Sequence, residues 1–313
     1  MASDGVLKRF SGSPTLLDGG MGQELLRRGM PSTEQSLWSA NALLDDPELV
    51  QAVHEDFLRA GADIITTNTY ATPRERLEKA GLGEQVDTLN RKAGVLAEQA
   101  REAVNRDALI AGSLPPIRGS YRPDRVGSFE EIEPQYRAQA QLLAPYVDLF
   151  ICETMSTPEE ARAALTGATS TNRPVLVSYT IADRESPDEN GPFLRNGQPL
   201  AEAVQAVSDL PVRGLLFNCS FPESISAAIP SLRALTDLPI GAYANAFTRI
   251  PEEWNEHTDA LPEKRTDLGP DAYAEHARRW IEEGAQIVGG CCEVGPEHIA
   301  RLRTVLDDAQ ENR

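Results

Sequence analysis

The feature that most constrains the fold is a regular alternation of short apolar runs with amphipathic stretches of helical periodicity. Eight such runs are rich in β-forming residues, and they cover residues 15–17, 63–67, 108–114, 147–152, 175–181, 214–217, 239–243 and 285–288. Strands interleaved with helices pair in parallel, either in a closed barrel or in a doubly wound sheet. Continuous apolar runs such as Ile64-Ile65 and Leu215-Leu216-Phe217 are typical of strands buried on both faces.

Helical patterns occupy the segments between these runs. Proline followed by acidic residues begins two of them, at Pro47 and Pro158. Others are expected over 85–105, 130–143, 200–207, 224–235, 270–281 and 296–306. Two polar segments, 183–198 and 248–268, are longer than ordinary α/β connections, and long loops in compact domains tend to be functional. Both follow strands, so in a barrel they would lie on the catalytic face.

Length and charge narrow the class of protein. The 313 residues fit one (β/α)8 barrel of about 250 residues with extended loops, although two ordinary domains would also fit. A net charge of −18 argues against binding to nucleic acid or to anionic membrane surfaces. Neither a bilayer-spanning run of about 20 apolar residues nor a signal-peptide core is found. We therefore expect a cytoplasmic protein with reduced cysteines; the sequence does not define its oligomeric state.

The chemically distinctive residues share one position, the carboxyl ends of the predicted strands. In a barrel these ends meet at one rim, where active sites lie. The residues at this position are Asp18, Asn68, Tyr70, Glu153, Cys219, Asn245, Cys291 and Cys292.

Three of these residues are cysteines that the fold would bring together, Cys219 and the pair Cys291-Cys292. Three thiolates suit Zn²⁺, and three protein ligands leave one position open for a substrate, as in catalytic sites. Because thiolates cancel the metal charge, such a site holds a nucleophilic sulfur better than it activates water. Full ionisation of a thiol of pKa ~8.5 gains only about 30-fold, or about 2 kcal/mol, at pH 7, so alignment with a reaction partner must contribute more.

Alternative interpretations of the cysteines and histidines remain open. The vicinal pair could be apolar filler or a disulfide, and Cys219 alone could be a core residue. Cys152 lies within the fourth predicted strand and is expected in the core. The histidines fall on predicted helices or a polar loop, and we expect them to be structural or solvated: His54, His257, His276 and His298.

Over nearly all of its length the chain resembles the homocysteine S-methyltransferase family. The most specific motif is Gly289-Gly290-Cys291-Cys292 with an upstream Asn218-Cys219. Weaker matches are Leu17-Asp18-Gly19-Gly20-Met21-Gly22, Leu37-Trp38-Ser39-Ala40, Gly61-Ala62-Asp63, Thr67-Asn68-Thr69-Tyr70 and Glu153-Thr154. The resemblance implies a single (β/α)8 TIM barrel over residues 1–313, with extended loops on its C-terminal face.

The resemblance also implies site roles. Cys219, Cys291 and Cys292 would be the zinc ligands, and Asp18 and Glu153 would receive the substrate ammonium. Tyr70 would be a catalytic residue near the sulfur and the methyl donor. Backbone N–H groups at Gly19, Gly20 or Met21 would hold the substrate carboxylate, and Asn68 and Asn245 would complete the substrate-binding set.

Each of these positions also has a structural interpretation. Asp18 could stabilise its own turn, and Glu153 could cap the helix that follows it. Asn68 and Asn245 suit turns regardless of function, and Tyr70 could pack as any half-buried aromatic does. The sequence Ala244-Asn245-Ala246 also departs from the Pro-Asn ending that we expect after the seventh strand.

These observations predict methyl transfer from a sulfonium donor to zinc-bound homocysteine, which gives methionine. S-methylmethionine is the leading donor and S-adenosylmethionine the second. The partners are then small molecules. Alternatives are a related thiol or selenol methyltransferase that uses betaine or a dimethylsulfonium compound, a zinc hydrolase on the same rim, and a non-catalytic zinc- or thiol-binding protein. With few aromatic residues at the strand ends, an aromatic cage for betaine is expected less.

Overall fold

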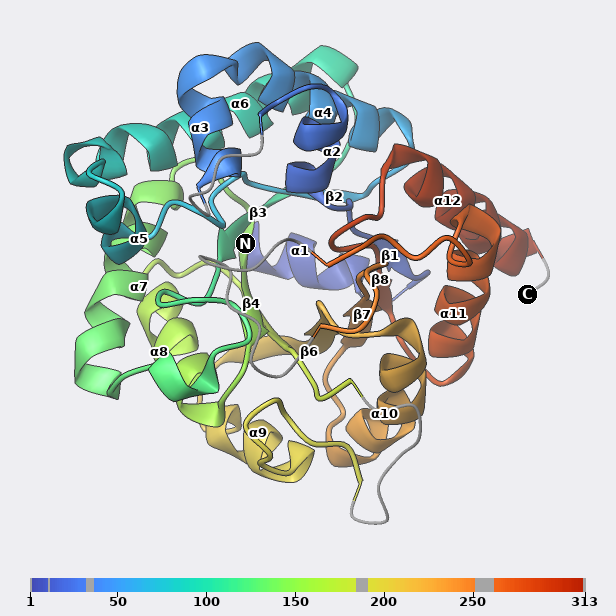
Figure 1. Cartoon of the computed structure of the whole chain (residues 1–313). Helices are drawn as coiled ribbons and strands as arrows, with labels where there is room; N and C mark the ends of the chain where they lie inside the picture. The colour runs from blue at the N-terminus through green and yellow to red at the C-terminus, as the bar shows by residue number, and fades with distance from the viewer. Residues whose placement is uncertain (1, 11, 32–36, 184–190, 251–261, 312–313) are drawn as a thin grey trace.

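Eight parallel strands form a barrel, one of the two parallel folds that the alternation allows and the one that the family resemblance implies (Figure 1). The computed structural model describes residues 2–10, 12–31, 37–183, 191–250 and 262–311. The strands follow one another in the order β1-β8-β7-β6-β5-β4-β3-β2, and a parallel bridge between Leu17 and Ile64 joins β1 to β2. Their bounds are β1 Thr15–Leu16, β2 Ile64–Thr66, β3 Leu109–Leu114, β4 Leu149–Met155, β5 Val175–Tyr179, β6 Val212–Asn218, β7 Ile240–Tyr243 and β8 Ile287–Val288. The prediction of a (β/α)8 barrel is confirmed, and all eight predicted strands are present.

The predicted helices surround the barrel, and their starts follow from capping chemistry. Asp46 accepts a hydrogen bond from the Leu49 N–H at 3.1 Å, and Thr157 accepts one from the Glu160 N–H at 3.0 Å. Each of these caps is followed by proline at the first helical position. The helices are α4 Pro47–Arg59, α6 Val86–Val104, α7 Phe129–Leu143, α8 Pro158–Thr169, α9 Leu200–Val207, α10 Pro222–Leu235, α11 Pro270–Glu282 and α12 Pro296–Glu311.

Several short helices were not predicted from the sequence. They are α1 Ala2–Arg9, α2 Met21–Arg27, α3 Trp38–Asp45 and α5 Arg74–Lys79, together with the 3₁₀ turns η1 Gly83–Gln85 and η2 Pro123–Arg125. None of them exceeds eight residues. About two turns are too few to display an apolar stripe of period 3.6, so tertiary contacts stabilise these helices rather than a sequence pattern.

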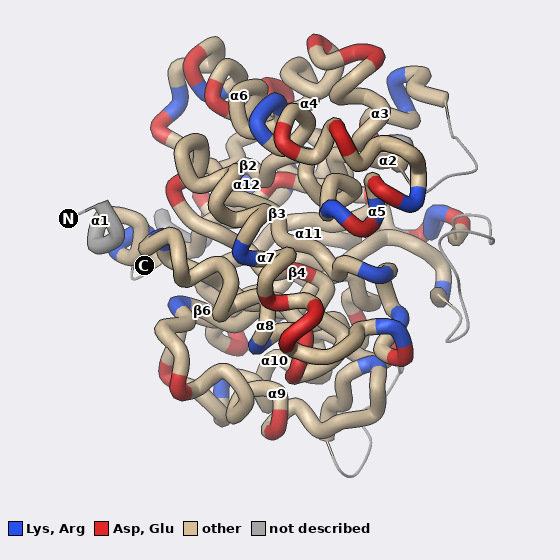
Figure 2. Tube along the Cα trace, turned by 90° about the vertical axis from the view of Figure 1, so that its left-hand side faces the viewer, with Lys and Arg blue, Asp and Glu red and all other residues tan. Residues whose placement is uncertain are grey.

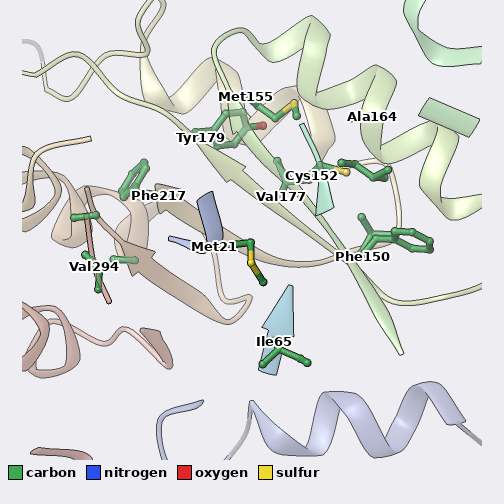
Figure 3. Close-up of a cluster of buried hydrophobic side chains, with 14 of the residues drawn as sticks. Met21, Ile65, Phe150, Cys152, Met155, Ala164, Val177, Tyr179, Phe217 and Val294 are labelled. Carbon is green, nitrogen blue, oxygen red and sulfur yellow. The ribbon is translucent and has the colours of Figure 1, made fainter. Parts of the chain in front are cut away.

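Each strand separates two apolar layers. Alternate residues such as Ile64, Leu149 and Ile151 fill the barrel interior, while Ile65, Phe150 and Cys152 pack outward beneath the helices. Figure 3 shows Phe150, Cys152 and Ile65 in this outer layer. Cys152 is fully buried, as predicted for a core residue. Continuous apolar strands are therefore required because both faces are buried.

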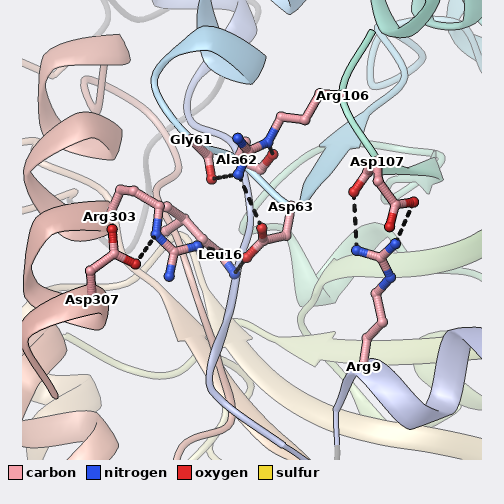
Figure 4. Close-up of polar contacts among 9 residues, drawn as sticks. All are labelled: Arg9, Leu16, Gly61, Ala62, Asp63, Arg106, Asp107, Arg303 and Asp307. Carbon is pink, nitrogen blue, oxygen red and sulfur yellow. Dashed lines mark hydrogen bonds and ion pairs between the residues drawn. The ribbon is translucent and has the colours of Figure 1, made fainter. Parts of the chain in front are cut away.

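The amino-terminal end of the barrel is closed by α1. Val6 and Phe10 belong to the same apolar cluster as the inward-facing strand residues, and α1 lies across this end in Figures 1 and 2. Nearby, Asp63 accepts a hydrogen bond from the Leu16 N–H at 3.0 Å and pairs with Arg106 and Arg303 (Figure 4). The amino-terminal end of the barrel thus contributes to the stability of the fold. The active site is expected at the opposite end, where the carboxyl ends of the strands lie.

Many of the other charged residues lie on the outer helices of the described chain. Figure 2 shows acidic and basic residues spread over the outer helices. Within the described ranges, no helix is long and apolar enough to cross a membrane. Of the two long loops, residues 184–190 and 251–261 lie outside the described residues. The described remainder of each turns back on the barrel, through antiparallel bridges between Ile181 and Leu194 and between Phe247 and Lys264.

The histidines have structural surroundings. His54 and His298 are buried, whereas His276 is half-buried and lies 3.3 Å from the Ser226 hydroxyl. His257 lies outside the described residues. Among the described residues, the one group that could hold a metal ion contains no histidine.

Candidate active site

The carboxyl ends of the strands surround a cavity of about 180 Å³. All the predicted site residues except Asn245 line it: Asp18, Gly19, Gly20, Met21, Asn68, Tyr70, Glu153, Cys219, Cys291 and Cys292. Asn245 is fully buried and is not among the described residues that line the cavity. Its backbone N–H donates to the Ser220 carbonyl, and its Oδ1 accepts from the Phe247 N–H. Asn245 therefore holds together the loops that follow β6 and β7.

The three cysteines meet at one side of this cavity, with their sulfur atoms within 4.8 Å of one another. The sulfur atoms of Cys291 and Cys292 are 3.9 Å apart. In tetrahedral coordination with Zn–S bonds of ~2.3 Å, neighbouring sulfurs lie about 3.8 Å apart, so this separation fits one zinc ion. Cys219 and Cys291 are paired as a disulfide, with Cα atoms 5.9 Å apart, and Cys292 is a free thiol. Metal binding and this disulfide are alternative states of the same sulfurs, because only thiolates ligate the metal.

Backbone contacts position the cysteine pair. The Cys291 N–H donates to the Ala244 carbonyl, and the Cys292 carbonyl accepts from the Ala246 N–H, both at 2.9 Å. Gly290 permits a close approach, since a Cβ there would lie 2.0 Å from Cγ1 of Val294. It is not among the glycines with positive φ, so this glycine provides space rather than a left-handed conformation.

Cys219 reaches the cluster from a strained position after β6. Its φ is +48°, in the left-handed region that non-glycine residues rarely adopt. The preceding Asn218 side chain supports this turn, because it accepts from the Thr154 N–H and the Ser178 hydroxyl, each at 2.8 Å.

Burial raises the pKa of the neighbouring Cys292 thiol; a bound cation would oppose this shift by favouring the thiolate.

Two buried carboxyl groups line another part of the cavity wall. Asp18 accepts hydrogen bonds from the Thr66 N–H at 2.7 Å and the Thr66 hydroxyl at 3.1 Å. Burial raises the pKa of Asp18 to about 8, although these hydrogen bonds oppose the shift. The Asp18 side chain thus bonds across to Thr66 of β2.

Glu153 is the second carboxyl group and lies within β4, on its inward face. It accepts hydrogen bonds from the Ser113 hydroxyl and, at 3.4 Å, from the Tyr243 hydroxyl. Burial raises the pKa of Glu153 to about 7. Because Thr157 caps α8, Glu153 is not needed as a helix cap. Both acids line the cavity, and burial shifts both carboxyl groups toward the neutral form.

The remaining predicted residues complete the walls. The Asn68 amide donates to the Ser39 carbonyl at 2.8 Å, and the Tyr70 hydroxyl lies 2.8 Å from the Ser120 hydroxyl. Burial raises the pKa of Tyr70 far above neutrality, so its phenol stays protonated. The Gly20 N–H already donates to the Val294 carbonyl at 2.9 Å. Met21 begins α2, whose first-turn N–H groups have no acceptor within the helix.

Sequence reasoning missed several lining residues. Tyr121, Tyr243 and Phe247 add aromatic faces beside Tyr70, and Ser113 bonds Glu153. Aromatic residues are few at the strand ends, as the sequence shows, but residues in the loops add further rings to the cavity wall. Tyr243 and Ser113 end or nearly end predicted strands, so their positions could have been found. Tyr121 and Phe247 lie in loops, where no periodic signal marks them.

The fold and this site define a (β/α)8-barrel enzyme whose cavity combines a three-cysteine cluster with two buried carboxyl groups. A family model for homocysteine S-methyltransferase matches residues 15–306. The Escherichia coli protein named homocysteine S-methyltransferase is 33% identical, with 92% of this chain and 94% of that protein covered. Homocysteine S-methyltransferase 2 of Zea mays is 29% identical over 95% of this chain and 91% of that protein.

Solved structures agree with these sequence matches. The crystal structure of the homocysteine methyltransferase MmuM from Escherichia coli, in a metallated form, superposes with a TM-score of 0.79 at 31% identity. It covers 97% of this chain and all of that one, and an oxidized form of the same enzyme matches with the same TM-score. The chain belongs to the homocysteine S-methyltransferase family.

Proposed function

We propose that this protein transfers a methyl group from a sulfonium donor to the thiolate of homocysteine, with S-methylmethionine as the leading donor. The observation that carries the proposal is the three-cysteine cluster in the same cavity as Asp18 and Glu153. A bound zinc ion would hold the homocysteine sulfur as a thiolate, since coordination favours the ionised form. The thiols must be reduced for this chemistry, which supports a reducing, cytoplasmic location.

The two carboxyl groups are proposed to bind the substrate ammonium. A cation within hydrogen-bonding distance favours their ionised forms and opposes the effect of burial on their pKa values. Met21, in the first turn of α2, is proposed to donate its backbone N–H to the substrate carboxylate, with Gly19 and Gly20 shaping the approach. Homocysteine would then be held at both ends of its amino-acid group, with its sulfur directed toward the cysteines.

Tyr70 and Asn68 are proposed to line the path of the methyl group. Because the Tyr70 phenol stays neutral, Tyr70 acts as an aromatic wall and hydroxyl dipole and not as a base. A sulfonium cation is attracted to aromatic faces. Asn245 is proposed to act through the loop after β7, which it holds in place next to the cysteine pair.

The reaction needs no general base in this scheme. A zinc ion held by Cys219, Cys291 and Cys292 would favour the thiolate form of the substrate, and the thiol proton would pass to water. The thiolate electron pair then forms the new S–CH₃ bond, while the donor S–CH₃ bond breaks and leaves its pair on a neutral thioether. Alignment of the two sulfurs supplies the larger part of the rate enhancement.

A second candidate donor is a quaternary ammonium compound such as betaine. Four aromatic side chains, Tyr70, Tyr121, Tyr243 and Phe247, line the cavity, and aromatic faces also bind quaternary cations. Zinc hydrolysis is less well supported, because three thiolate ligands would leave a bound water weakly activated.

The test combines metal analysis with a panel of donors. We expect about one zinc per chain in reduced protein and methionine formation from homocysteine with a sulfonium donor. Cys219→Ser, Cys291→Ser and Cys292→Ser should each lose zinc and activity, whereas Cys152→Ala should keep both, since Cys152 lies in the outer core. Reduced protein that binds no metal, or that forms no methionine with any onium donor, would refute the proposal.

A further inference from the structure

A second, smaller cavity adjoins the active site. It has a volume of about 80 Å³, and its lining includes Tyr121, Asp183, Arg195 and Arg249. Tyr121 also lines the large cavity, so its ring forms a shared wall. The two cavities differ in charge. The large one is lined by two carboxyl groups and one arginine, Asp18, Glu153 and Arg76, whereas the small one is lined by two arginines and one aspartate.

An almost completely buried ion pair forms the floor of the small cavity. Arg195 Nη2 lies 2.6 Å from Asp183 Oδ2, and the two side chains are only 6% and 2% exposed. Asp183 also accepts from the Phe221 N–H at 2.8 Å, and Arg195 Nε donates to the Thr180 hydroxyl at 3.3 Å. A buried ion pair contributes little net stability compared with an apolar pair, because both charges lose hydration. Its presence at a cavity wall therefore suggests a role in binding.

The ring of Tyr121 connects this pair to the cysteines. The Arg195 guanidinium carbon lies 4.4 Å from the centre of the Tyr121 ring. Tyr121 belongs to one apolar cluster with Cys219 and Phe247, against which Cys292 packs. Tyr121 thus lines the same cavity as the three cysteines and also lies against the arginine. A small molecule at this wall can place one end near the sulfurs and the other near Arg195.

We propose that Arg195, oriented by Asp183 and Tyr121, binds the carboxylate of the methyl donor and so selects onium donors that carry a carboxylate. This inference rests on the proposed function and specifies its donor class. The onium centre would face Tyr121 and Tyr70 on the side of the sulfurs, where aromatic faces favour a cation. A guanidinium has five N–H donors, and among the described residues the hydrogen bonds of Arg195 to Asp183 and Thr180 use two of them. Arg249 adds a second positive charge at the same cavity.

The decisive comparison uses two donors that differ in the carboxylate, S-methylmethionine and trimethylsulfonium. In Arg195→Gln, the KM for S-methylmethionine should rise about 10- to 100-fold, as expected for loss of a charge-assisted hydrogen bond. The KM for homocysteine and the rate with trimethylsulfonium should stay within about twofold of wild type. Arg195→Lys, which keeps the charge, should restore part of the affinity.

Two further variants separate binding from folding. Arg195→Gln leaves the Asp183 carboxylate buried without this partner, so the double variant Asp183→Asn/Arg195→Gln removes both charges together and should show the same selective rise in KM. Arg162→Gln is the matched control, because Arg162 pairs with Asp209 on the surface with a 39% exposed side chain. It should change neither KM.

The outcomes are distinct. An equal loss with both donors, or an equal rise in the KM for homocysteine, would assign Arg195 a structural role and overturn the inference. An unchanged KM for S-methylmethionine in active Arg195→Gln would also overturn it while leaving the proposed function intact. Failure of the wild-type enzyme with every onium donor would refute the proposed function, and this inference with it.

Discussion

Asp18→Asn should make the substrate-free protein more stable while it weakens homocysteine binding. In the folded protein, burial raises the pKa of Asp18 to about 8, compared with 3.8 for an unperturbed aspartate. Between these values the unfolded chain releases the proton and the folded protein keeps it. The contribution of Asp18 to the free energy of unfolding of the wild-type protein is therefore fully present below pH 4. It falls by about 1.4 kcal/mol for each pH unit as the pH rises toward 8.

Asparagine removes this loss and keeps the local contacts. Its Oδ1 can accept from the Thr66 N–H and its amide can donate to the Thr66 hydroxyl, which replaces both contacts of the carboxylate. From pH 5 to pH 8 the variant should gain about 4 kcal/mol relative to wild type, which is three pH units at the linkage slope. The same substitution removes the negative charge proposed to bind the ammonium, so activity falls as stability rises.

Urea unfolding of reduced, substrate-free protein at pH 5 and pH 8 measures this difference. Groups that titrate in both proteins and do not interact with Asp18 cancel when the free energies of unfolding are subtracted. The exposed Asp45→Asn serves as a matched control and should show no pH-dependent gap. If Asp18→Asn is no more stable than wild type at pH 8, or if the gap is the same at both pH values, the assignment of a neutral, buried Asp18 is wrong.

Three further predictions follow from other parts of the structure. Because the pKa values of Asp18 and Glu153 are about 8 and about 7, kcat/KM for homocysteine should fall as the pH drops through both values, and Glu153→Gln should raise KM at least about 10-fold and remove the lower step from the pH profile. A Cβ on Gly20 would lie 2.7 Å from the Cys291 carbonyl oxygen, so Gly20→Ala should weaken zinc binding about 10-fold or more in competition with a chromophoric chelator, whereas Gly269→Ala, with nothing within 4 Å, should not. The imidazole nitrogens of His54 have no hydrogen-bond partner among the described residues, and burial lowers the pKa of His54 to about 3. Wild-type stability should therefore fall as the pH drops below 6.5, and His54→Leu should gain about 2 kcal/mol on wild type between pH 8 and pH 5 in urea unfolding; a gap that does not change with pH would contradict this.

The strands and the long helices could be predicted because their signals are local. Strands buried on both faces must be apolar throughout, and amphipathic helices must repeat their apolar residues every three to four positions. The short helices α2, α3 and α5 have no such pattern, and packing against the barrel stabilises them.

The position of the cavity-lining residues was also predictable, but their contacts were not. Parallel strands of a barrel bring their carboxyl ends to one rim, so residues as distant in sequence as Cys219 and Cys291 could be expected to meet. The contact of Asp18 with Thr66, and of Glu153 with Ser113 and Tyr243, depends on neighbouring strands and their register. The burial of Asn245 behind the loops was equally invisible in the sequence.

The sequence by itself thus determined the order of strands and helices and the residue types at the strand ends, because hydrophobic periodicity and strand-end chemistry are encoded locally, and the family resemblance pointed to a barrel. Only the tertiary structure decided which carboxyl groups are desolvated, which aromatic rings face the sulfurs, and that Arg195 lies behind Tyr121 in a second cavity. Desolvation and cavity shape arise from the packing of many distant residues at once, and no local pattern in the chain records them.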